Sequence, residues 1–400
     1  MARIVYRELQ KPKPVFYGLV LLHVLVVGLL GLGAFFYMEH HGHIVSGMTN
    51  QIVWGTPHVF AVFLIVAASG ALNVASISSV FAQATYKPFA RLSGLLAIAL
   101  LAGGLFVLVL DLGRPERLTV AITTYNFKSI FAWNIYLYTG FMVIVAAYLW
   151  SMMAREGGRF YKPVAYLAFA WRLILTTGTG SIFGFLVARE AYDSALYAPL
   201  FIVSSFAYGL AFMLLVLLTM GHSLRVELMS EEVITKFRRL LIVFVLGTIF
   251  LTVILHVTKL YATKLHGVET FLLFSGNVYS LVFWIGQIGI GSIVPLLILA
   301  SPAFGRGRHG LSLAGVLILI GGLCQMYVII IGGQAYPLTL FPGMEVTSSF
   351  GDGQIAHYAP SLPEVLLGVS GVSLAMLITA IALMVLRVLP HDPNRPVAAQ

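Results

Sequence analysis

The chain has 400 residues, of which 59% are hydrophobic and only 10% are charged, and its mean hydropathy is +0.94. Soluble domains usually contain about 45–50% apolar and about 25% charged residues, so this composition excludes an ordinary soluble domain and predicts an integral membrane protein. The net charge of +9 could suit nucleic acid, but the basic residues lie in short loops between apolar runs and form no stripe, so no nucleic-acid partner is expected.

Ten apolar runs are long enough to cross a bilayer, because a helical span needs about 20 residues at about 1.5 Å each. They lie at approximately 15–37, 57–82, 92–112, 129–153, 163–188, 197–220, 238–261, 271–300, 310–333 and 363–389. The first run is too long for a signal-peptide core and lacks a convincing cleavage site, so it is kept as a helix. Continuous apolarity without two-residue alternation excludes barrel strands. The expected fold is therefore all-α, one polytopic membrane domain over residues 1–400 with ten transmembrane helices.

The basic residues predict the orientation, because cytoplasmic loops carry an excess of Lys and Arg. With ten spans, both termini lie on one side. Six of the 24 basic residues fall on the opposite side, namely Arg114, Arg117, Lys128, Arg189, Lys259 and Lys264. Arg172 falls on neither side, and the other 17 share the side of the termini, which is therefore predicted to be cytoplasmic.

The third run ends in "VLDLGRPERL", residues 109–118, at the predicted outer boundary. Two interpretations remain open. In the first, Gly113 ends the helix, Pro115 prevents it from restarting and the charges only mark the interface. In the second, the charges orient an outer loop against a partner or a polar cofactor head. They are Asp111, Arg114, Glu116 and Arg117.

Arg172 lies about 14 Å into the fifth run, where a charge is costly unless it is paired or hydrated. It is therefore a candidate functional residue, although snorkelling towards the inner surface is an alternative. The following "TTGTGS", residues 176–181, predicts a polar track towards the outer side, and its glycines would also allow close helix packing.

Histidines mark two other outer helix ends. His58 opens the second run and can exchange protons with solvent, while the small polar residues behind it are more typical of helix packing. His256 and Lys259 lie on roughly one face of the seventh run. A haem between His58 and His256, or a metal at "EHHGH", residues 39–43, are further alternatives.

Three more features concern possible sites. Trp284, Gln287 and Pro295 in the eighth run suggest a kinked helix with one buried hydrogen-bonding side chain. The connection 334–362 has no basic residue and is expected to form a docking surface or a lid. Because Cys324 is the only cysteine, an all-cysteine iron–sulfur or zinc site within the chain is excluded, and redox metals would come from histidines or partners.

The stretch "YKPFARLSGLLAIALLAGGLFVLVLDLGRPERL" from Tyr86 resembles the signature of the NrfD-like family, the membrane subunits of polysulfide-reductase-type respiratory complexes. The tract "GTGSIFGFLVAREAYDSALYAPLFI" from Gly178, the ten spans and "GGQAYPL" look more like the DsrP/Hmc-type branch, and a DsrP-like subunit of a sulfite-reduction-associated complex is expected.

The resemblance implies a subunit that binds menaquinone or ubiquinone transiently and has no haem or iron–sulfur cluster of its own. It implies two four-helix bundles, residues 57–188 and 197–333, with peripheral helices at 15–37 and 363–389. The quinone site would open near the outer face against a periplasmic ferredoxin-like iron–sulfur subunit, and polar bundle residues would conduct protons. A multihaem cytochrome c and further membrane and cytoplasmic redox subunits would complete the complex in a bacterial or archaeal cytoplasmic membrane.

The expected site residues follow from the outer helix ends, the buried Arg and the matched motif. Proton-coupled chemistry is assigned to His58, Asp111, Arg172 and His256. Quinone contact is assigned to His58, Arg114, Arg189, Glu190, Trp284 and Gln287. Partner docking is assigned to Arg114, Glu116 and Arg117. A secondary transporter, a b-type cytochrome and a structural membrane anchor are the alternatives, although no inverted repeat of the kind typical of transporters is found.

Overall fold

The structure is a computed structural model that describes residues 4–154, 156–224, 226–302, 304–305, 307–338, 341, 344, 348, 351 and 353–391, without the side chains of 156, 157 and 391. In this part of the chain, nine helices are long and apolar enough to cross a membrane, and there are only two strands, of three residues each. The predicted all-α membrane fold is confirmed.

The first half of the chain contains β1 (Val5–Arg7), α1 (Pro14–Leu25), η1 (Val26–Gly31), α2 (Leu32–His41), η2 (His43–Val45), α3 (Thr56–Ala71), α4 (Asn73–Ser79), η3 (Ala84–Phe89), α5 (Ala90–Leu110), η4 (Pro115–Arg117), α6 (Leu118–Thr123), α7 (Ile130–Met153), η5 (Glu156–Phe160) and α8 (Tyr161–Gly184). The second half contains α9 (Tyr197–Leu224), α10 (Glu231–Tyr261), η6 (Thr263–Leu265), α11 (His266–Leu273), α12 (Val278–Leu281), η7 (Val282–Ile293), α13 (Val294–Ala300), α14 (Arg308–Tyr327), η8 (Val328–Gly332), α15 (Gly333–Ala335), α16 (Leu362–Val385) and β2 (Leu389–His391).

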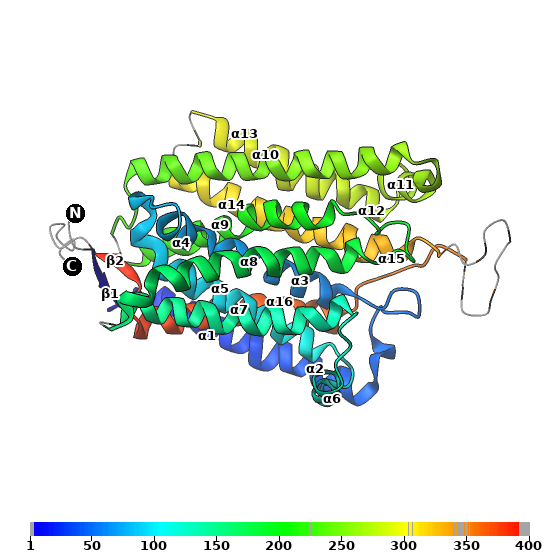
Figure 1. Cartoon of the computed structure of the whole chain (residues 1–400), viewed down its shortest axis with the longest axis horizontal. Coiled ribbons are helices and arrows are strands. Elements are labelled where there is room, and N and C mark those ends of the chain that lie inside the picture. Colours follow the sequence, from blue (N-terminus) through cyan, green and yellow to red (C-terminus); the bar gives the residue numbers. More distant parts are fainter. Residues whose placement is uncertain are drawn as a thin grey trace.

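The long helices run side by side along the longest axis of the molecule (Figure 1). Strands β1 and β2 pair antiparallel at one end, which we call the termini end. Helices α2, α6, α11, α12 and α15 lie at the opposite end, which we call the distal end (Figure 1). The motif loop 111–117 and the starts of α3, α9 and α16 are at the distal end.

Helices α3 and α9 form the centre of the molecule and are buried over most of their length, whereas α1 exposes most of its apolar side chains. The centre is tight because Gly70 of α3 faces Gly209 of α9. A Cβ atom on Gly209 would overlap the backbone of Gly70 and Ala71. Small residues at such crossings are what allow membrane helices to approach closely.

Several helix starts follow from local sequence. Proline occupies the first turn of α1, α3 and α16, where its missing N–H costs no hydrogen bond. Ser361 and Glu364 form a capping box at the start of α16. Ser230 caps α10 by accepting a hydrogen bond from the backbone N–H of Val233.

The expected fifth span, 163–188, corresponds to α8, which is not among the nine helices selected by hydropathy. The helix has 24 residues and packs against α7 and α9, with Arg172 and several hydroxyl side chains buried. It thus buries its polar groups within the bundle and exposes apolar side chains such as Leu167 and Ile174.

Two predicted ends are wrong. The run 271–300 is not one helix, because α11 ends at Leu273 and Gly276, at φ +66°, makes the turn into α12 at Val278. The last run does not extend to 389, because Leu386 is extended and Leu389–His391 pairs with Val5–Arg7.

Within the predicted first bundle, α3 packs against α5 and α8, and α7 packs against α5 and α8. Within the predicted second bundle, α9 packs against α10 and α14, and η7 packs against α14, while α16 packs on α5, η1 and α3. However, α3 packs against α9 nearly as extensively as against α5, so the division into two bundles stays a prediction.

Candidate functional site

A histidine and a buried carboxylate meet at the distal end between α3 and the end of α5. His58 Nδ1 lies 2.7 Å from Asp111 Oδ2, and the exposed fractions of these side chains are 17% and 0%. The two atoms are close enough for an ion pair, but the orientation of the two groups is not that of a hydrogen bond. Imidazole and carboxylate side chains are the groups that general acid–base chemistry uses most often, so this pair is a candidate site for proton exchange.

The Trp54 ring lies beside His58 and connects it to two further aromatic rings. The Trp54 ring stacks near the His58 ring with centroids 6.2 Å apart, and it also contacts Phe131 and Phe183 at 5.7 and 6.0 Å. Phe183 is buried, whereas Phe131 is exposed. The imidazole therefore lies beside an apolar aromatic surface that opens to the outside at Phe131.

Gln334, from the "GGQAYPL" segment, fixes the chain that leads into α3. Its side-chain oxygen accepts hydrogen bonds from the backbone N–H of Val53 and Trp54 at 3.0 and 3.1 Å, and its amide donates to the Trp54 carbonyl at 2.9 Å. Gln334 is buried, so these bonds hold the Trp54 backbone in one position beside His58.

Arg189 joins the same two segments. Its guanidinium donates to the Gln334 carbonyl at 2.8 Å and to the Gln51 carbonyl at 2.7 Å. Burial lowers the pKa of Arg189, and the nearby Tyr192 partly offsets this effect. Both terminal nitrogens are thus bound to backbone carbonyls, which makes Arg189 a clamp between residues 51 and 334.

A second buried carboxylate, Glu364, supports the start of α3 from α16. The Tyr358 hydroxyl donates to Glu364 Oε1 at 2.7 Å and accepts a hydrogen bond from the Thr56 N–H at 2.7 Å. Glu364 Oε2 also accepts from the Gly47 N–H at 2.7 Å. Burial, and the neighbouring Glu364, raise the pKa of Tyr358, so its hydroxyl stays protonated and can donate.

The EHHGH run reaches the motif loop through His43. A Cβ atom on Gly113, which has φ +51°, would lie 3.0 Å from His43 Nε2. A larger residue at Gly113 would therefore be strained and would displace this ring. The described residues contain no group of three His, Cys, Asp or Glu side chains suited to a metal ion.

A second histidine–carboxylate pair lies at the distal end of α10. His256 Nδ1 is hydrogen-bonded to Glu269 Oε2 of α11 at 2.7 Å, with exposed fractions of 15% and 0%. Lys259, one turn further along α10, is buried and donates to the carbonyls of Glu190, Ala191 and Tyr192. This cluster repeats the chemistry of the first pair in the other half of the chain.

Polar groups continue from His256 into the bundle. A cavity of about 20 Å³ is lined by His256, Gln287 and Gln325 among others, and a second of about 10 Å³ shares the two glutamines. The first is large enough for one water molecule. Gln325 Oε1 accepts a hydrogen bond from the Tyr208 hydroxyl on α9. Hydrogen-bonding groups thus extend from the distal end towards the α3–α9 crossing.

Arg172 lies on the other side of that crossing. Its guanidinium donates to Asn73 Oδ1 at 2.9 Å and to the Ser69 carbonyl at 3.4 Å. The Thr176 hydroxyl lies 2.5 Å from the Ser69 hydroxyl. Arg172 is 1% exposed, so it does not snorkel. Within the "TTGTGS" tract Thr176 shares the Ser69 contact, whereas Thr177 is exposed, and the polar track towards the outer side stays a prediction.

The structure separates the other predicted site residues. Arg114, Glu116 and Arg117 are exposed on the motif loop and form no ion pair with any described residue, because Asp111 faces His58 instead. Trp284 is half exposed, with Nε1 donating to the Leu273 carbonyl at 2.8 Å. Gln287 is buried between the two small cavities.

The eighth span, for which a kinked helix was predicted, contains a π-helical segment. Residues Val282–Ile293 form η7, and Pro295 begins the α-helix that follows. π-helical turns widen a helix and are frequent at functional sites. Gln287 lies within η7, so the irregular backbone carries the buried amide.

Glu269, Gln334 and Glu364 are site residues that were not predicted from the sequence. Gln334 and Glu364 lie in or beside the 334–362 connection, and much of that connection's middle lies outside the described residues. The sequence "SLPE", residues 361–364, has the Ser-x-x-Glu pattern of a capping box, which could have indicated that Glu364 lies at the start of a helix. Nothing local in the sequence indicated that Glu269 pairs with His256.

Comparison with known proteins identifies the family to which this chain belongs. Residues 44–337, well over half of the chain, match the family described as polysulphide reductase, NrfD. The chain is 28% identical to the Hdr-like menaquinol oxidoreductase integral membrane subunit of Archaeoglobus fulgidus, over 92% of this chain and 93% of that protein. It is 25% identical to a selenate reductase subunit of Mesobacillus selenatarsenatis, over 87% of this chain and 88% of that protein.

A polysulfide reductase polypeptide of Wolinella succinogenes is also 25% identical, over 72% of this chain and 96% of that protein. These relatives are all named as parts of oxidoreductases, and the family match includes both histidine–carboxylate pairs and the motif loop. The chain therefore belongs to the NrfD family of polysulphide reductase membrane subunits.

Proposed function

We propose that this chain is the quinone-binding membrane subunit of a respiratory electron-transfer complex, and that the His58–Asp111 pair exchanges protons with the quinone. The observation that carries this proposal is the buried carboxylate 2.7 Å from a partly accessible imidazole, beside an aromatic surface at one end of the bundle. The relative named as a menaquinol oxidoreductase subunit supports quinone as the ligand class.

The residues around His58 fit such a ligand. A quinone exchanges two electrons and two protons, so its site needs an apolar slot, hydrogen-bond partners and a titratable group. Trp54 and Phe131 supply apolar surface next to the imidazole. With Nδ1 directed to Asp111, His58 keeps Nε2 for a hydrogen bond to a second group.

The chemistry of the pair follows from its charges. His58 accepts a proton from a quinol hydroxyl, or donates one in the reverse reaction, and Asp111 stabilises the imidazolium form. Arg189 and Gln334 act as positioning residues, because they hold the Trp54 segment against α15. Arg189 therefore takes part in quinone binding through the segment that it clamps.

The His256–Glu269 pair is proposed to continue the proton route. It lies at the same end of the bundle, and the polar groups behind it, Gln287, Gln325 and Tyr208, lead towards the α3–α9 crossing. Arg172 is proposed to maintain the polar environment on the other side of that crossing. Proton translocation across the membrane would use both sets of groups.

The electron partner is proposed to be a periplasmic iron–sulfur subunit. The single Cys324 leaves no cysteine-ligated cluster in this chain, so electrons pass to or from a neighbouring subunit. Arg114, Glu116 and Arg117 offer exposed charges on the loop that directly follows Asp111. Docking there would bring the partner next to the quinone. The assignment to the DsrP/Hmc-type branch, with its multihaem cytochrome c, stays a prediction.

The test compares His58→Gln and Asp111→Asn in the assembled complex. Both variants should lower quinol-linked electron transfer about 100-fold or more, because a positioned acid–base group contributes about 10²–10⁴ to the rate. His40→Gln is the matched control, since His40 is exposed at the distal end of α2 outside both pairs. An assembled complex that keeps its quinol kinetics in both variants would refute the proposal.

A further inference from the structure

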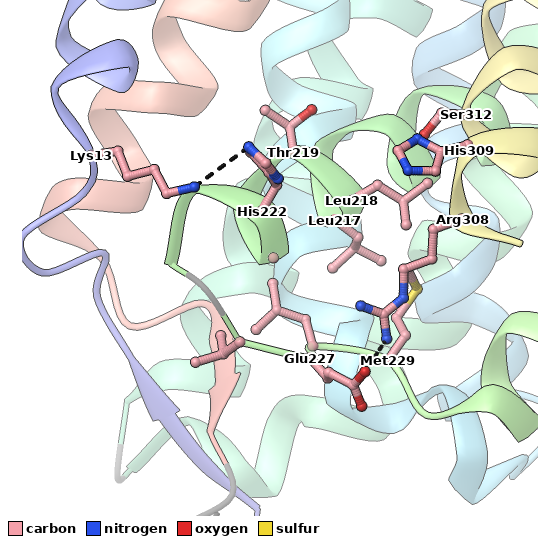
Figure 2. A pocket seen from close by; sticks show the side chains of 13 residues that line it. Lys13, Leu217, Leu218, Thr219, His222, Glu227, Met229, Arg308, His309 and Ser312 are labelled. Atoms are coloured by element: carbon pink, nitrogen blue, oxygen red, sulfur yellow. Dashed lines mark hydrogen bonds and ion pairs between the residues drawn. The ribbon is translucent and has the colours of Figure 1, made fainter. Parts of the chain in front are cut away.

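A cavity of about 540 Å³ lies at the termini end, the end opposite both histidine–carboxylate pairs (Figure 2). Its polar side chains come from three places in the sequence. Lys13 precedes α1, His222 lies near the end of α9, and Arg308 and His309 begin α14. We call this space the basic cavity.

The basic cavity has cationic groups on two opposite sides. In Figure 2, Lys13 points towards His222 from one side, with Nζ 3.5 Å from Nε2, and Arg308 approaches from the other. Arg308 Nη2 is paired with Glu227 Oε1 at 2.6 Å and also lies 4.0 Å from Glu231 Oε1, so two carboxylates neutralise part of the charge on the Arg308 side. Lys13 forms no ion pair with any carboxylate that the structure describes.

The walls between these charges are apolar. Leu217 and Leu218 of α9 lie between the Lys13 side and the Arg308 side (Figure 2). A ligand that fits here therefore combines a negative charge with hydrocarbon. Soluble phosphate would satisfy the basic groups and leave the leucines without a contact.

An apolar groove of about 260 Å³ adjoins the basic cavity. It lies between α1, α9 and α16, and Thr219 lines both spaces. On α1 it runs from Phe16, one turn after Lys13, to His23, and on α9 it runs from Met220 back to Phe212. Both stretches correspond to about 10 Å along a helix axis, and both lead from the termini end into the bundle.

We infer that the basic cavity and the apolar groove together bind one anionic phospholipid. Its phosphate lies among Lys13, His222 and Arg308, and one acyl chain lies along the groove. Basic pockets between transmembrane helices at the lysine- and arginine-rich side of a membrane bind such headgroups. The lipid would join the peripheral helices α1 and α16 to the central α9. This inference is independent of the proposed quinone chemistry at the distal end.

The headgroup part is tested with the purified full chain in detergent, titrated with phosphatidylglycerol or with phosphatidylcholine of the same acyl chains. Native mass spectrometry counts the bound lipid. One phosphatidylglycerol should bind about tenfold more tightly than phosphatidylcholine. Lys13→Gln should weaken phosphatidylglycerol binding about fivefold, because each basic group near the headgroup contributes about 1 kcal/mol. Lys162→Gln is the matched control, an exposed lysine at the same end outside the cavity, and should leave binding unchanged.

The acyl part is tested with Leu19→Trp, which narrows the groove, against Leu22→Trp, which faces outwards on the same helix and lines neither space. Only Leu19→Trp should weaken phosphatidylglycerol binding. Equal binding by Lys13→Gln and the parent chain would overturn the inference, as would equal binding by the two tryptophan variants. Displacement by millimolar inorganic phosphate, or by a soluble quinone analogue, would assign the cavity to that ligand and overturn the lipid assignment.

Discussion

Arg172 is a full positive charge inside the helix bundle without a carboxylate partner among the described residues. Its surroundings compensate in other ways. Asn73 and the Ser69 carbonyl accept its hydrogen bonds, and the guanidinium carbon lies 5.2 and 5.0 Å from the ring centroids of Phe169 and Phe206. Neutral dipoles and aromatic faces therefore stabilise the charge, and removal of that charge leaves no unpaired carboxylate behind.

Arg172→Leu should consequently lower proton-coupled turnover at least tenfold while the complex still assembles. The structural cost is the unsatisfied Asn73 amide oxygen, about 1–3 kcal/mol, which a bundle of this size can tolerate. Quinol-linked proton release by the complex in vesicles, together with its yield and melting temperature, provides the measurement. Arg172→Lys keeps the charge and should restore part of the turnover. Failed assembly combined with normal turnover of the residual complex would make Arg172 a structural residue only.

At the scale of whole helices, the crossing of α3 and α9 determines how closely the two halves of the chain approach. Gly70 and Gly209 bring the two backbones into contact, and the Ser205 carbonyl lies directly against Gly70. Phe206, the next residue on α9, contributes a ring to the Arg172 environment. Helix spacing at this crossing therefore affects the polar groups on both sides of it.

Gly209→Ala should destabilise the protein, because its methyl group would overlap the backbone of α3 and force the helices apart. Overpacking of this kind costs about 1–3 kcal/mol, and for a chain of this size the melting temperature in detergent should fall by about 1–4 °C. Gly18→Ala is the control, because a Cβ atom there meets nothing within 4 Å. It should leave the melting temperature unchanged or raise it slightly, since alanine is the better helix former. Equal effects of both substitutions would contradict the close contact at Gly209.

The apolar runs predicted most of the long helices, because the bilayer length and the hydrogen-bonding demand of the backbone act on every span alike. The turn at Gly276 was missed because it lies inside an apolar run, where composition gives no contrast between helix and loop. The strand at Leu389–His391 was missed because its partner, Val5–Arg7, lies at the other end of the sequence.

The candidate site was predictable to the level of helix ends only. Alternating spans place His58, Asp111, Arg189 and His256 at one boundary. In the structure Arg189 is bonded to Gln334 of α15 and His256 to Glu269 of α11, two helices of the distal end, and Asp111 contacts His58. Which side chains these residues contact depends on the rotation of each helix about its own axis. The sequence of an evenly apolar helix does not indicate that rotation. Asp111, at the end of α5, consequently faces His58 of α3. The prediction from sequence had instead placed Asp111 in one charged group with Arg114.

At the scale of the whole molecule, the two ends differ in charge and in chemistry. Of the basic residues that the structure describes, most lie at the termini end, together with the basic cavity, and the distal end carries both histidine–carboxylate pairs. The excess of lysine and arginine predicts that the termini end faces the cytoplasm. The proposed iron–sulfur partner then approaches from the periplasm, at the motif loop.

Labelling of single cysteines tests this orientation. In a Cys324→Ala background, Glu116→Cys should react with a membrane-impermeant maleimide in intact cells, whereas Lys162→Cys should react only after the membrane is permeabilised. Both positions are exposed, so accessibility depends on the side of the membrane and not on burial. The Cys324→Ala protein without a new cysteine serves as the blank. The reverse pattern would place Asp111 and the motif loop on the cytoplasmic side, and a periplasmic electron partner could then no longer reach the His58–Asp111 pair.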